Sequence, residues 1–540
     1  MNKYSLLILS VAGGFFSALA WTDWCPGLIL LVSFTPFFLI GEYLAENPGK
    51  YSAGTYFTYL LPGFVVFCII SLGWIRVVSI VAAVGVIVVL SFLMAFVLWA
   101  AFGIRQRAGR TAGNLSIIAF WLAFELLCLK FDLFSPWVNL GNGLAKDIMF
   151  IQWYEITGTS GGTLWILLSN LLLSSVLACS FTHGRKMILP FTIWIAVIIL
   201  PVSISLHRFF TIGPADSEPA EILIIQPNID PYTEKFSTPF EKQVEKVISM
   251  AGSEITAKTR WIMTPETTVD DPVNEKSIST NKYVQMMRWL TVDNPGVAVV
   301  TGMVTFIPYS PDKWVPYQAD DQTESPGLQY EIFNSALLID TGKPVRIYHK
   351  SKLVAGFETS FSPGVARVLR KLLPQLGGTN RNYGTQDERI SFEHPVNRDK
   401  SAPVICFESV YGRHVADYVK NGANMLFIIT NDGWWKNSSG YKQHLSYASL
   451  RAIETRRPVA RAANTGISCF IDLKGVITKR TGWWRAETIR GDLVPETRIT
   501  PYVRYGDYIL YIGLLISVSV VLFVLILFPL KKKRSIIRQI

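Results

Sequence analysis

Long apolar runs divide the chain into two very different parts. Seven apolar segments lie within the first 206 residues and an eighth lies near the C-terminus. Most are close to the roughly 20 residues that a membrane-crossing helix needs, and the second and fifth are shorter. The pattern predicts a polytopic α-helical membrane bundle of about eight helices. The segments are Tyr4 to Trp21, Pro26 to Ile40, Tyr56 to Ile75, Val77 to Ile104, Leu115 to Leu129, Gly161 to Phe181, Met187 to Leu206 and Tyr508 to Leu530.

The stretch between the seventh and eighth segments has a different pattern. It is roughly 300 residues long, enough for one large α/β domain. Short runs rich in β-branched residues alternate with amphipathic helical stretches, which predicts a mixed α/β sheet covered by helices. The strand-like runs are "EILIIQPNI", "RWIMTPETTV", "GVAVVTGMV", "FNSALLID", "PVRIYHKSKLV", "APVICFESV", "NMLFIITND" and "ISCFIDLKGVI". The helical stretches are "PFEKQVEKVISMAG", "NKYVQMMRWL", "YGRHVADYVKNG" and "QHLSYASLRAIETRR".

Composition supports a membrane protein. The chain of 540 residues is 50% hydrophobic and 13% aromatic, with a mean hydropathy of +0.31, which is too apolar for an ordinary soluble protein of this size. A net charge of +11 would indicate nucleic-acid binding if the basic residues formed one stripe. Many of them lie instead in short loops or in the terminal "KKKR", so we expect no nucleic-acid partner.

The basic clusters predict the orientation. If successive helices cross the membrane in opposite directions, all of these clusters fall on the same side, which is the positive-inside pattern. Both termini are therefore expected in the cytoplasm. The polar insert is expected on the other side, in the periplasm of a cell with two membranes. The predicted domains are residues 1–206 with helices 1–7, 207–505 as the extracytoplasmic domain, 506–530 as helix 8 and 531–540 as a basic cytoplasmic tail. The clusters are Arg105, Arg107 and Arg110, then Arg185 and Lys186, then Lys531 to Arg534.

The first apolar segment has two interpretations. The sequence "MNKYSLLILSVAGGFFSALAW" has a basic start, an apolar middle and small residues at Ala18 and Ala20, as in a cleavable signal peptide. We favour an uncleaved anchor. Both alternatives insert with the basic start inside, so the predicted orientation does not depend on the choice.

Cys406 is the first candidate for chemistry. Four of the six cysteines lie in or beside membrane segments, where cysteine is ordinarily a small apolar side chain, and Cys469 lies inside the alternating strand "GISCFIDL" as a core residue. Cys406, in "SAPVICFESVYG", ends a buried run. It is a candidate nucleophile. The four membrane cysteines are Cys25, Cys68, Cys128 and Cys179.

Glu266 and Lys350 lie at the ends of two other predicted strands. Strand-end residues in α/β sheets lie where ligands bind, although Glu266 taken alone is also compatible with a solvated loop acid, and Lys350 with a charged edge strand. Together, the three residues supply what thiol acyl transfer needs. A carboxylate takes the proton of a thiol that is mostly neutral near pH 7, and an ammonium stabilises the oxyanion that forms.

Several motifs resemble a known family. "TPET", "YHKSKL", "VICFESVYG" and "TNDGWW" are similar to the landmark motifs of the nitrilase superfamily, and the flanking membrane helices make the chain resemble the apolipoprotein N-acyltransferase family. "IIQPNID", "PGVARV", "PWVNLGN" and "QHLSYASLRAIETRRPVARAANTGIS" are further matches. The resemblance implies an αββα sandwich fused to the helices, with Glu266 as general base, Lys350 as oxyanion stabiliser and Cys406 as nucleophile.

The resemblance also implies supporting residues. Glu358 matches a family acid near the triad, and Glu408 matches another that supports the site. Two departures stand out, because the family's "PFGE" is "AGFE" here and its frequent Tyr after the cysteine is Phe407. Because Phe407 has no hydroxyl, these departures put in doubt a role for the family's Tyr hydroxyl, but they leave the three triad residues in place.

Other residues have competing interpretations. Trp434, Trp435 and Phe236, the last at a position where the family often has Trp, either line an acyl path or pack in the core. Glu125 is costly in lipid, so we expect it to face the bundle interior and form a structural hydrogen bond. His444 has no partner at metal-ligand spacing, and we predict no metal site and no cofactor.

The resemblance implies a reaction. The enzyme is expected to transfer a fatty acyl chain, through a Cys406 thioester, to the α-amine of diacylglyceryl-cysteine on an apolipoprotein, the last step of bacterial lipoprotein maturation. The donor is a phospholipid, commonly the sn-1 chain of phosphatidylethanolamine. One alternative is a membrane-anchored amidase with the same triad and water as acceptor. The other is a non-catalytic membrane protein that recognises lipid or peptide.

Overall fold

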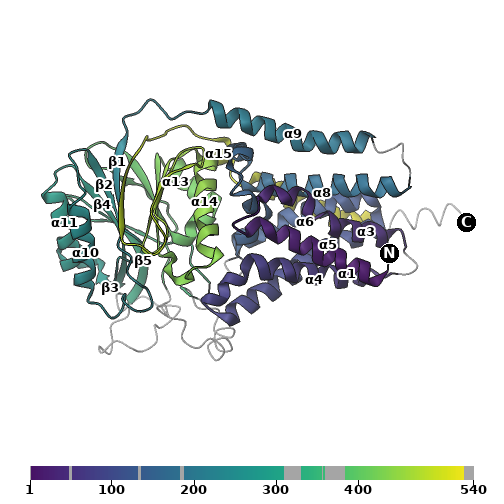
Figure 1. Cartoon of the computed structure of the whole chain (residues 1–540), viewed down its shortest axis with the longest axis horizontal. Helices are drawn as coiled ribbons and strands as arrows, with labels where there is room; N and C mark the ends of the chain where they lie inside the picture. The colour runs from purple at the N-terminus through teal and green to yellow at the C-terminus, as the bar shows by residue number, and fades with distance from the viewer. Residues whose placement is uncertain are drawn as a thin grey trace, which may run out of the picture. The chain divides into compact units, whose positions relative to one another are not determined.

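The computed structural model describes residues 2–47, 51–131, 135–182, 188–308, 330–355, 357–358 and 383–527. The chain forms two compact units (Figure 1). The helical unit comprises Met1–Arg76, Ile80–Thr211 and Tyr505–Ile540, and the sheet unit comprises Val77–Ser79 and Ile212–Arg504. The predicted tail at 531–540 and the cluster of Arg185 and Lys186 lie outside the described residues.

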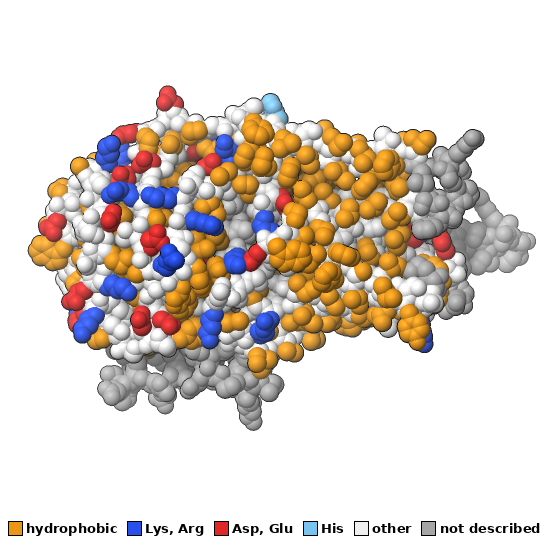
Figure 2. All heavy atoms as spheres, viewed as in Figure 1, with side chains coloured by type: hydrophobic (Ala, Val, Ile, Leu, Met, Phe, Trp, Pro, Cys, Tyr) orange, Lys and Arg blue, Asp and Glu red, His pale blue; other side chains and the backbone are white. Residues whose placement is uncertain are grey.

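The helical unit confirms the predicted membrane bundle. Among the described residues, eight helices are long and apolar enough to cross a membrane, one for each predicted segment. The second and fifth spans are longer than their apolar runs, because the helices continue into flanking polar residues. Figure 2 shows hydrophobic side chains covering this unit, as expected of a surface that faces lipid. The main helices are α1 (Lys3–Ala18), α3 (Thr35–Ala45), α4 (Ala53–Leu72), α5 (Ile80–Ala108), α6 (Arg110–Lys130), α8 (Thr159–Thr182), α9 (Ile188–Thr211) and α16 (Tyr508–Leu522).

Helices α1 and α4 touch through their backbones. A Cβ atom on Gly14 would lie 1.9 Å from the carbonyl oxygen of Gly63, and one on Gly63 would lie 2.4 Å from the carbonyl oxygen of Ser10. The amide of Gly63 donates to the Ser10 hydroxyl at 3.0 Å. Lipid gives no hydrophobic drive for helix association, so close approach at small residues and an interhelical hydrogen bond supply the contact.

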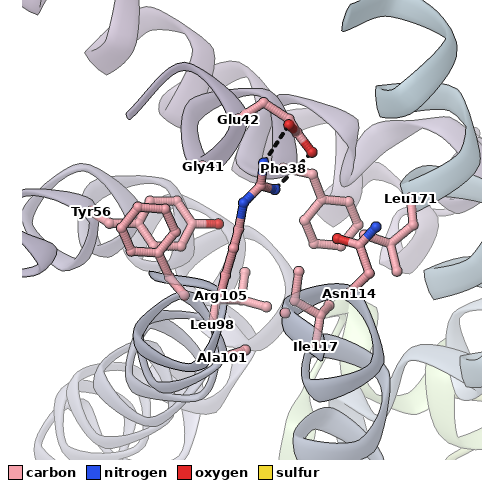
Figure 3. Close-up of a pocket in the computed structure, with 12 residues that line it drawn as sticks. Phe38, Gly41, Glu42, Tyr56, Leu98, Ala101, Arg105, Asn114, Ile117 and Leu171 are labelled. Carbon is pink, nitrogen blue, oxygen red and sulfur yellow. Dashed lines mark hydrogen bonds and ion pairs between the residues drawn. The ribbon is translucent and has the colours of Figure 1, made fainter. Parts of the chain in front are cut away.

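Buried charge is paired inside this unit. The Arg105 guanidinium on α5 donates to both carboxylate oxygens of Glu42 on α3, at 2.8 and 2.6 Å, and Figure 3 shows the pair beside Tyr56 and Asn114. A bidentate pair of this kind lowers the cost of placing both charges among apolar helices. It therefore links α3 to α5.

Glu125 on α6 faces the bundle interior, as predicted. It is 2% exposed. Its carboxylate accepts from the amide of Leu140 at 2.7 Å, the Thr163 hydroxyl at 2.7 Å and the indole of Trp121 at 3.2 Å. These donors make it a structural acceptor that joins α6 to α8 and the segment between them.

The sheet unit is the expected αββα sandwich. Its first sheet has the order β13-β1-β2-β4-β5-β6, with β3 also paired to β4, and its second has the order β12-β11-β10-β9-β8-β7. The Trp261 ring on β2 meets the Phe427 ring on β9 edge to face at 5.1 Å, so the two sheets pack against each other. The first sheet contains β1 (Ala220–Gln226), β2 (Thr259–Met263), β3 (Val269–Asn274), β4 (Ala298–Pro308), β5 (Tyr330–Ile339), β6 (Arg346–His349) and β13 (Glu487–Leu493). The second contains β7 (Phe392–Glu393), β8 (Lys400–Ile405), β9 (Met425–Thr430), β10 (Val459–Ala463), β11 (Cys469–Ile471) and β12 (Ile477–Arg480).

Helices cover the outer face of each sheet. The pair α10 (Phe240–Gly252) and α11 (Lys282–Val292) packs on the first sheet, where Val244, Val247 and Met287 join its buried core. The pair α13 (Gly412–Lys420) and α14 (Ser439–Thr455) packs on the second. Helices α10 and α13 lie within their predicted stretches, whereas α11 continues to Val292 and α14 begins at Ser439, beyond the stretches predicted for them.

The packing of the two glycines can be tested by adding one methyl group. Gly14→Ala should lower the thermal unfolding midpoint, because overpacking of a tight contact costs about 1–3 kcal/mol. Gly103→Ala on α5 is the matched control, since a Cβ there meets no atom within 4 Å. Thermal unfolding of purified protein in detergent measures both. Equal midpoints for the two variants would contradict the close contact.

Candidate active site

Three predicted residues come together at strand ends of the two sheets. Glu266 lies just beyond β2, Lys350 directly follows β6, and Cys406 directly follows β8. All three are buried, with 6%, 1% and 7% of their surfaces exposed. The charges of Glu266 and Lys350 both act on the Cys406 thiol. Segments far apart in the sequence therefore meet in one site.

The Lys350 ammonium is held between two carboxylates. Its Nζ donates to Glu266 Oε1 at 2.9 Å and to Glu358 Oε1 at 2.8 Å. Burial alone would lower the pKa of Lys350, but the two carboxylates outweigh burial and hold that pKa well above its usual range. Lys350 is therefore a fixed positive charge beside Glu266.

Cys406 adopts a strained backbone conformation. Its φ is +50°, in the left-handed region that non-glycine residues rarely occupy, and it begins a short 3₁₀ turn, Cys406–Val410. The predicted strand therefore ends at Ile405, one residue before the thiol. Burial, and then the Glu266 carboxylate, raise the pKa of Cys406 well above its usual range, although Lys350 acts in the opposite direction. The resting thiol is neutral, so its reaction with a carbonyl needs a base.

Two asparagines complete the environment of Glu266. The side-chain amide of Asn334 on β5 donates to Glu266 Oε1 at 2.8 Å and to Glu358 Oε1 at 3.2 Å. The backbone amide of Asn431 donates to Glu266 Oε2 at 3.1 Å. Sequence analysis missed Asn334, although an amide in the middle of the apolar strand "FNSALLID" was a usable signal.

Glu408 links the chain segments that carry Cys406 and Lys350. It is completely buried, and it accepts from the Ile405 amide at 2.8 Å, the Tyr348 hydroxyl at 2.7 Å and the Ser351 amide at 2.6 Å. Burial would raise the pKa of Glu408, but His414, the Tyr348 hydroxyl and the Ile405 amide outweigh it and lower that pKa. The carboxylate thus joins the chain just before Cys406 to the chain just after Lys350.

The predicted aromatic residues lie in different surroundings. Phe407 is 8% exposed and packs edge to face on Tyr411. Trp435 is half-buried and its ring lies 5.2 Å from that of His444. Trp434 accepts from the Tyr232 hydroxyl through its carbonyl at 2.7 Å, and Phe236 is 54% exposed. A role for these aromatic residues in an acyl path stays a prediction, and the motif "PGVARV" lies outside the described residues.

The position of Glu266 can be disturbed from a neighbouring strand. A Cβ on Gly302 would lie 2.6 Å from the Glu266 Cα and 2.5 Å from the Thr267 amide nitrogen, so Gly302→Ala should displace the carboxylate. We expect about a 10-fold to 100-fold slower modification of Cys406 by an activated acyl ester, in line with a misplaced reacting group. Gly252→Ala, where a Cβ meets nothing within 4 Å, is the control. Unchanged rates in both variants would contradict the prediction, because they would show that the structure accommodates the added Cβ without moving Glu266.

The variant Glu266→Gln tests how the charge of the Glu266 carboxylate affects the pKa of the Cys406 thiol. Because the Glu266 carboxylate raises the pKa of Cys406 and Lys350 lowers it, neutralising Glu266 should lower that pKa. Alkylation of the purified protein by iodoacetamide, followed against pH, should therefore rise at a lower pH than in the unmodified protein. A profile that stays in place or moves to higher pH would contradict the electrostatic arrangement.

Comparison with known proteins gives two family matches. The apolipoprotein N-acyltransferase N-terminal domain matches residues 13–172, and the carbon-nitrogen hydrolase domain matches residues 296–501. Among solved structures, an amidase of Nesterenkonia AN1 from the nitrilase superfamily has a TM-score of 0.36 and 14% identity, covering 56% of this chain and 98% of that one.

Curated relatives match most of the chain. Apolipoprotein N-acyltransferase of Chlorobaculum tepidum is 26% identical, over 85% of this chain and 86% of that protein. The protein of the same name from Thermotoga maritima is 26% identical, over 95% of this chain and 92% of its own length. The motifs, the membrane bundle and the αββα unit agree with these matches, and the chain is similar to apolipoprotein N-acyltransferases over most of its length, with their N-terminal domain followed by a carbon-nitrogen hydrolase domain.

Proposed function

We propose that the protein transfers a fatty acyl chain from a membrane phospholipid to the α-amine of diacylglyceryl-cysteine at the start of an apolipoprotein. The similarity to apolipoprotein N-acyltransferases supports an acyltransferase. The observation that supports the mechanism is the buried cluster in which Lys350 bonds to Glu266 and both act on the Cys406 thiol. Phosphatidylethanolamine is the proposed donor.

The first half-reaction forms a thioester. Glu266 removes the thiol proton as the Cys406 sulfur attacks the ester carbonyl, and the Lys350 ammonium stabilises the tetrahedral oxyanion. When the intermediate collapses, the C–O bond breaks and the lysophospholipid leaves with the proton from Glu266. Acyl transfer to the enzyme is then complete, with Glu266 again a carboxylate.

The second half-reaction forms an amide. The free α-amine of the acceptor attacks the thioester carbonyl, Glu266 takes a proton from the attacking nitrogen, and the C–S bond breaks. Cys406 leaves as a thiolate and regains the proton. Because a thioester reacts with an amine far more readily than an oxygen ester does, the covalent intermediate divides one difficult exchange into two easier steps.

The proposed location follows from the charge pattern. Basic residues such as Arg105 and Arg107 fall on the side predicted to be cytoplasmic, so we place the sheet unit on the periplasmic side of the bacterial inner membrane. Both substrates are then lipid-anchored at the surface where the reaction occurs. Water must be excluded from the thioester, or the acyl chain is lost as free acid.

Acylation of the enzyme can be observed directly. Purified protein incubated with phosphatidylethanolamine and no acceptor should gain the mass of one acyl group by intact-protein mass spectrometry. Cys406→Ala should gain none, because the nucleophile is absent, and Glu266→Gln should gain less than about a hundredth as much, since a general base contributes 10²-fold or more. An unmodified protein that never acquires the adduct would overturn the mechanism.

The same adduct distinguishes the amidase alternative, which the carbon-nitrogen hydrolase match favours. Acyl-enzyme separated from phospholipid is divided between buffer and buffer with a diacylglyceryl-cysteine peptide. A transferase keeps its acyl group in buffer and loses it to the peptide. A hydrolase releases free fatty acid at the same rate in both.

A further inference from the structure

A buried polar cluster next to Cys406 has no part in the proposed reaction. His444 on α14, Ser409, Asp432 and Arg461 on β10 are each no more than 1% exposed. Buried polar groups are costly unless they are hydrogen-bonded, and a group of four at one place needs a structural or functional reason. The contacts of His444 indicate that reason.

One edge of the His444 ring faces the nucleophile's own backbone. His444 Nε2 lies 3.1 Å from the main-chain carbonyl oxygen of Cys406 and 2.8 Å from Ser409 Oγ. The Ser409 hydroxyl donates to the same carbonyl at 2.7 Å. A carbonyl oxygen accepts and never donates, so these contacts assign the proton to Nε2. The Cys406 carbonyl therefore accepts two hydrogen bonds.

The opposite edge of the ring is fixed by charge. His444 Nδ1 lies 3.1 Å from a guanidinium nitrogen of Arg461 and 3.1 Å from Asp432 Oδ1. The same guanidinium nitrogen donates to Asp432 Oδ2 at 2.6 Å. Burial would raise the pKa of Asp432, but Arg461 and His444 hold it far below its usual range. The buried ion pair thus stays charged and prevents the imidazole from rotating.

The backbone that His444 contacts is the strained one. Cys406 has φ of +50°, a conformation whose energetic cost the surrounding structure must offset. The bonds from His444 and Ser409 to its carbonyl supply that offset at the residue itself. If they are lost, the backbone can relax and move the thiol away from Glu266.

We propose that His444 is a positioning residue, which holds the main-chain carbonyl of Cys406 and thereby keeps the thiol in reach of the Glu266 base. The inference rests on the proposed role of Cys406 as the nucleophile. His444 touches neither substrate nor thiol in this scheme. It acts through the backbone, and the Asp432–Arg461 pair acts through His444.

The test compares two replacements of His444 in the full-length protein. In His444→Gln the amide nitrogen can replace Nε2 as a donor, whereas His444→Leu has similar volume and no donor. We expect His444→Leu to lower the rate of acyl-adduct formation and of iodoacetamide alkylation about 10-fold to 100-fold, the effect of removing a buried hydrogen bond at a reacting group. His444→Gln should stay within about 5-fold of the unmodified protein, with the KM for phospholipid unchanged in both.

A second histidine provides the matched control. His394 is also buried in the sheet unit, but its Nε2 contacts the Arg260 carbonyl at 3.0 Å, and it packs on Trp261 rather than near Cys406. His394→Leu and His394→Gln should lower the melting temperature without slowing acylation of the folded protein. If His444→Leu fails to fold, Ser409→Ala removes the other donor to the same carbonyl and should slow acylation in its place.

Specific outcomes would overturn the inference. One is a normal rate of acylation in folded His444→Leu, or in Ser409→Ala if that variant is used instead. Another is an equal loss of acylation rate in His444→Gln and His444→Leu. A loss that follows melting temperature in the same way for His394 and His444 would also overturn it. Failure of the proposed function has a different signature: the unmodified protein forms no phospholipid adduct, while iodoacetamide alkylation still depends on the His444 donor.

Discussion

The buried ammonium of Lys350 is the charge around which the site is organised. An isolated ammonium in a protein interior is costly, and it is stable only where carboxylates and hydrogen bonds replace its water. Glu266 and Glu358 supply the carboxylates, and Asn334 bridges them from β5. Their combined charge is negative beside the thiol. Burial, and then the Glu266 carboxylate that pairs with Lys350, hold the pKa of Cys406 above its usual range, although Lys350 itself acts in the opposite direction.

Backbone strain occurs on both sides of this cluster. Cys406 and Thr267, the residue after Glu266, have φ values of +50° and +46°. In each case buried polar side chains bind next to the strained residue. Lys235, 3% exposed, donates to the Thr267 hydroxyl at 2.5 Å and pairs with Asp270 at 3.1 Å. Such conformations persist only when the surroundings over-determine them, so the proposed base and the proposed nucleophile are both preorganised by networks outside the proposed triad.

The sequence showed the elements better than it showed these networks. Apolar length predicted the eight helices long enough to cross a membrane that the described residues contain, and runs rich in β-branched residues predicted most strands described in the sandwich. Strand β10, "VARAA", was missed because the completely buried Arg461 interrupts its apolar pattern. The triad residues were visible as polar residues at strand ends and through motif resemblance. Asn334 and the contacts of His444 were not, because their partners lie on other strands and only the fold brings them together.

In both units, buried carboxylates are bound by positive charges or hydrogen-bond donors. In the helical unit the buried acids Glu42 and Glu125 are bound by Arg105 and by a set of neutral donors, because lipid offers no water to replace them. In the sheet unit the acids Glu266 and Glu408 are bound by the same kinds of donor, and among them the ammonium of Lys350 acts on the thiol of Cys406, the proposed nucleophile. Charge pairing that is structural in the helical unit is, in the sheet unit, also part of the proposed catalytic site. The difference comes from the placement of Cys406, whose strained backbone sets its sulfur beside charges that the fold must pair in any case.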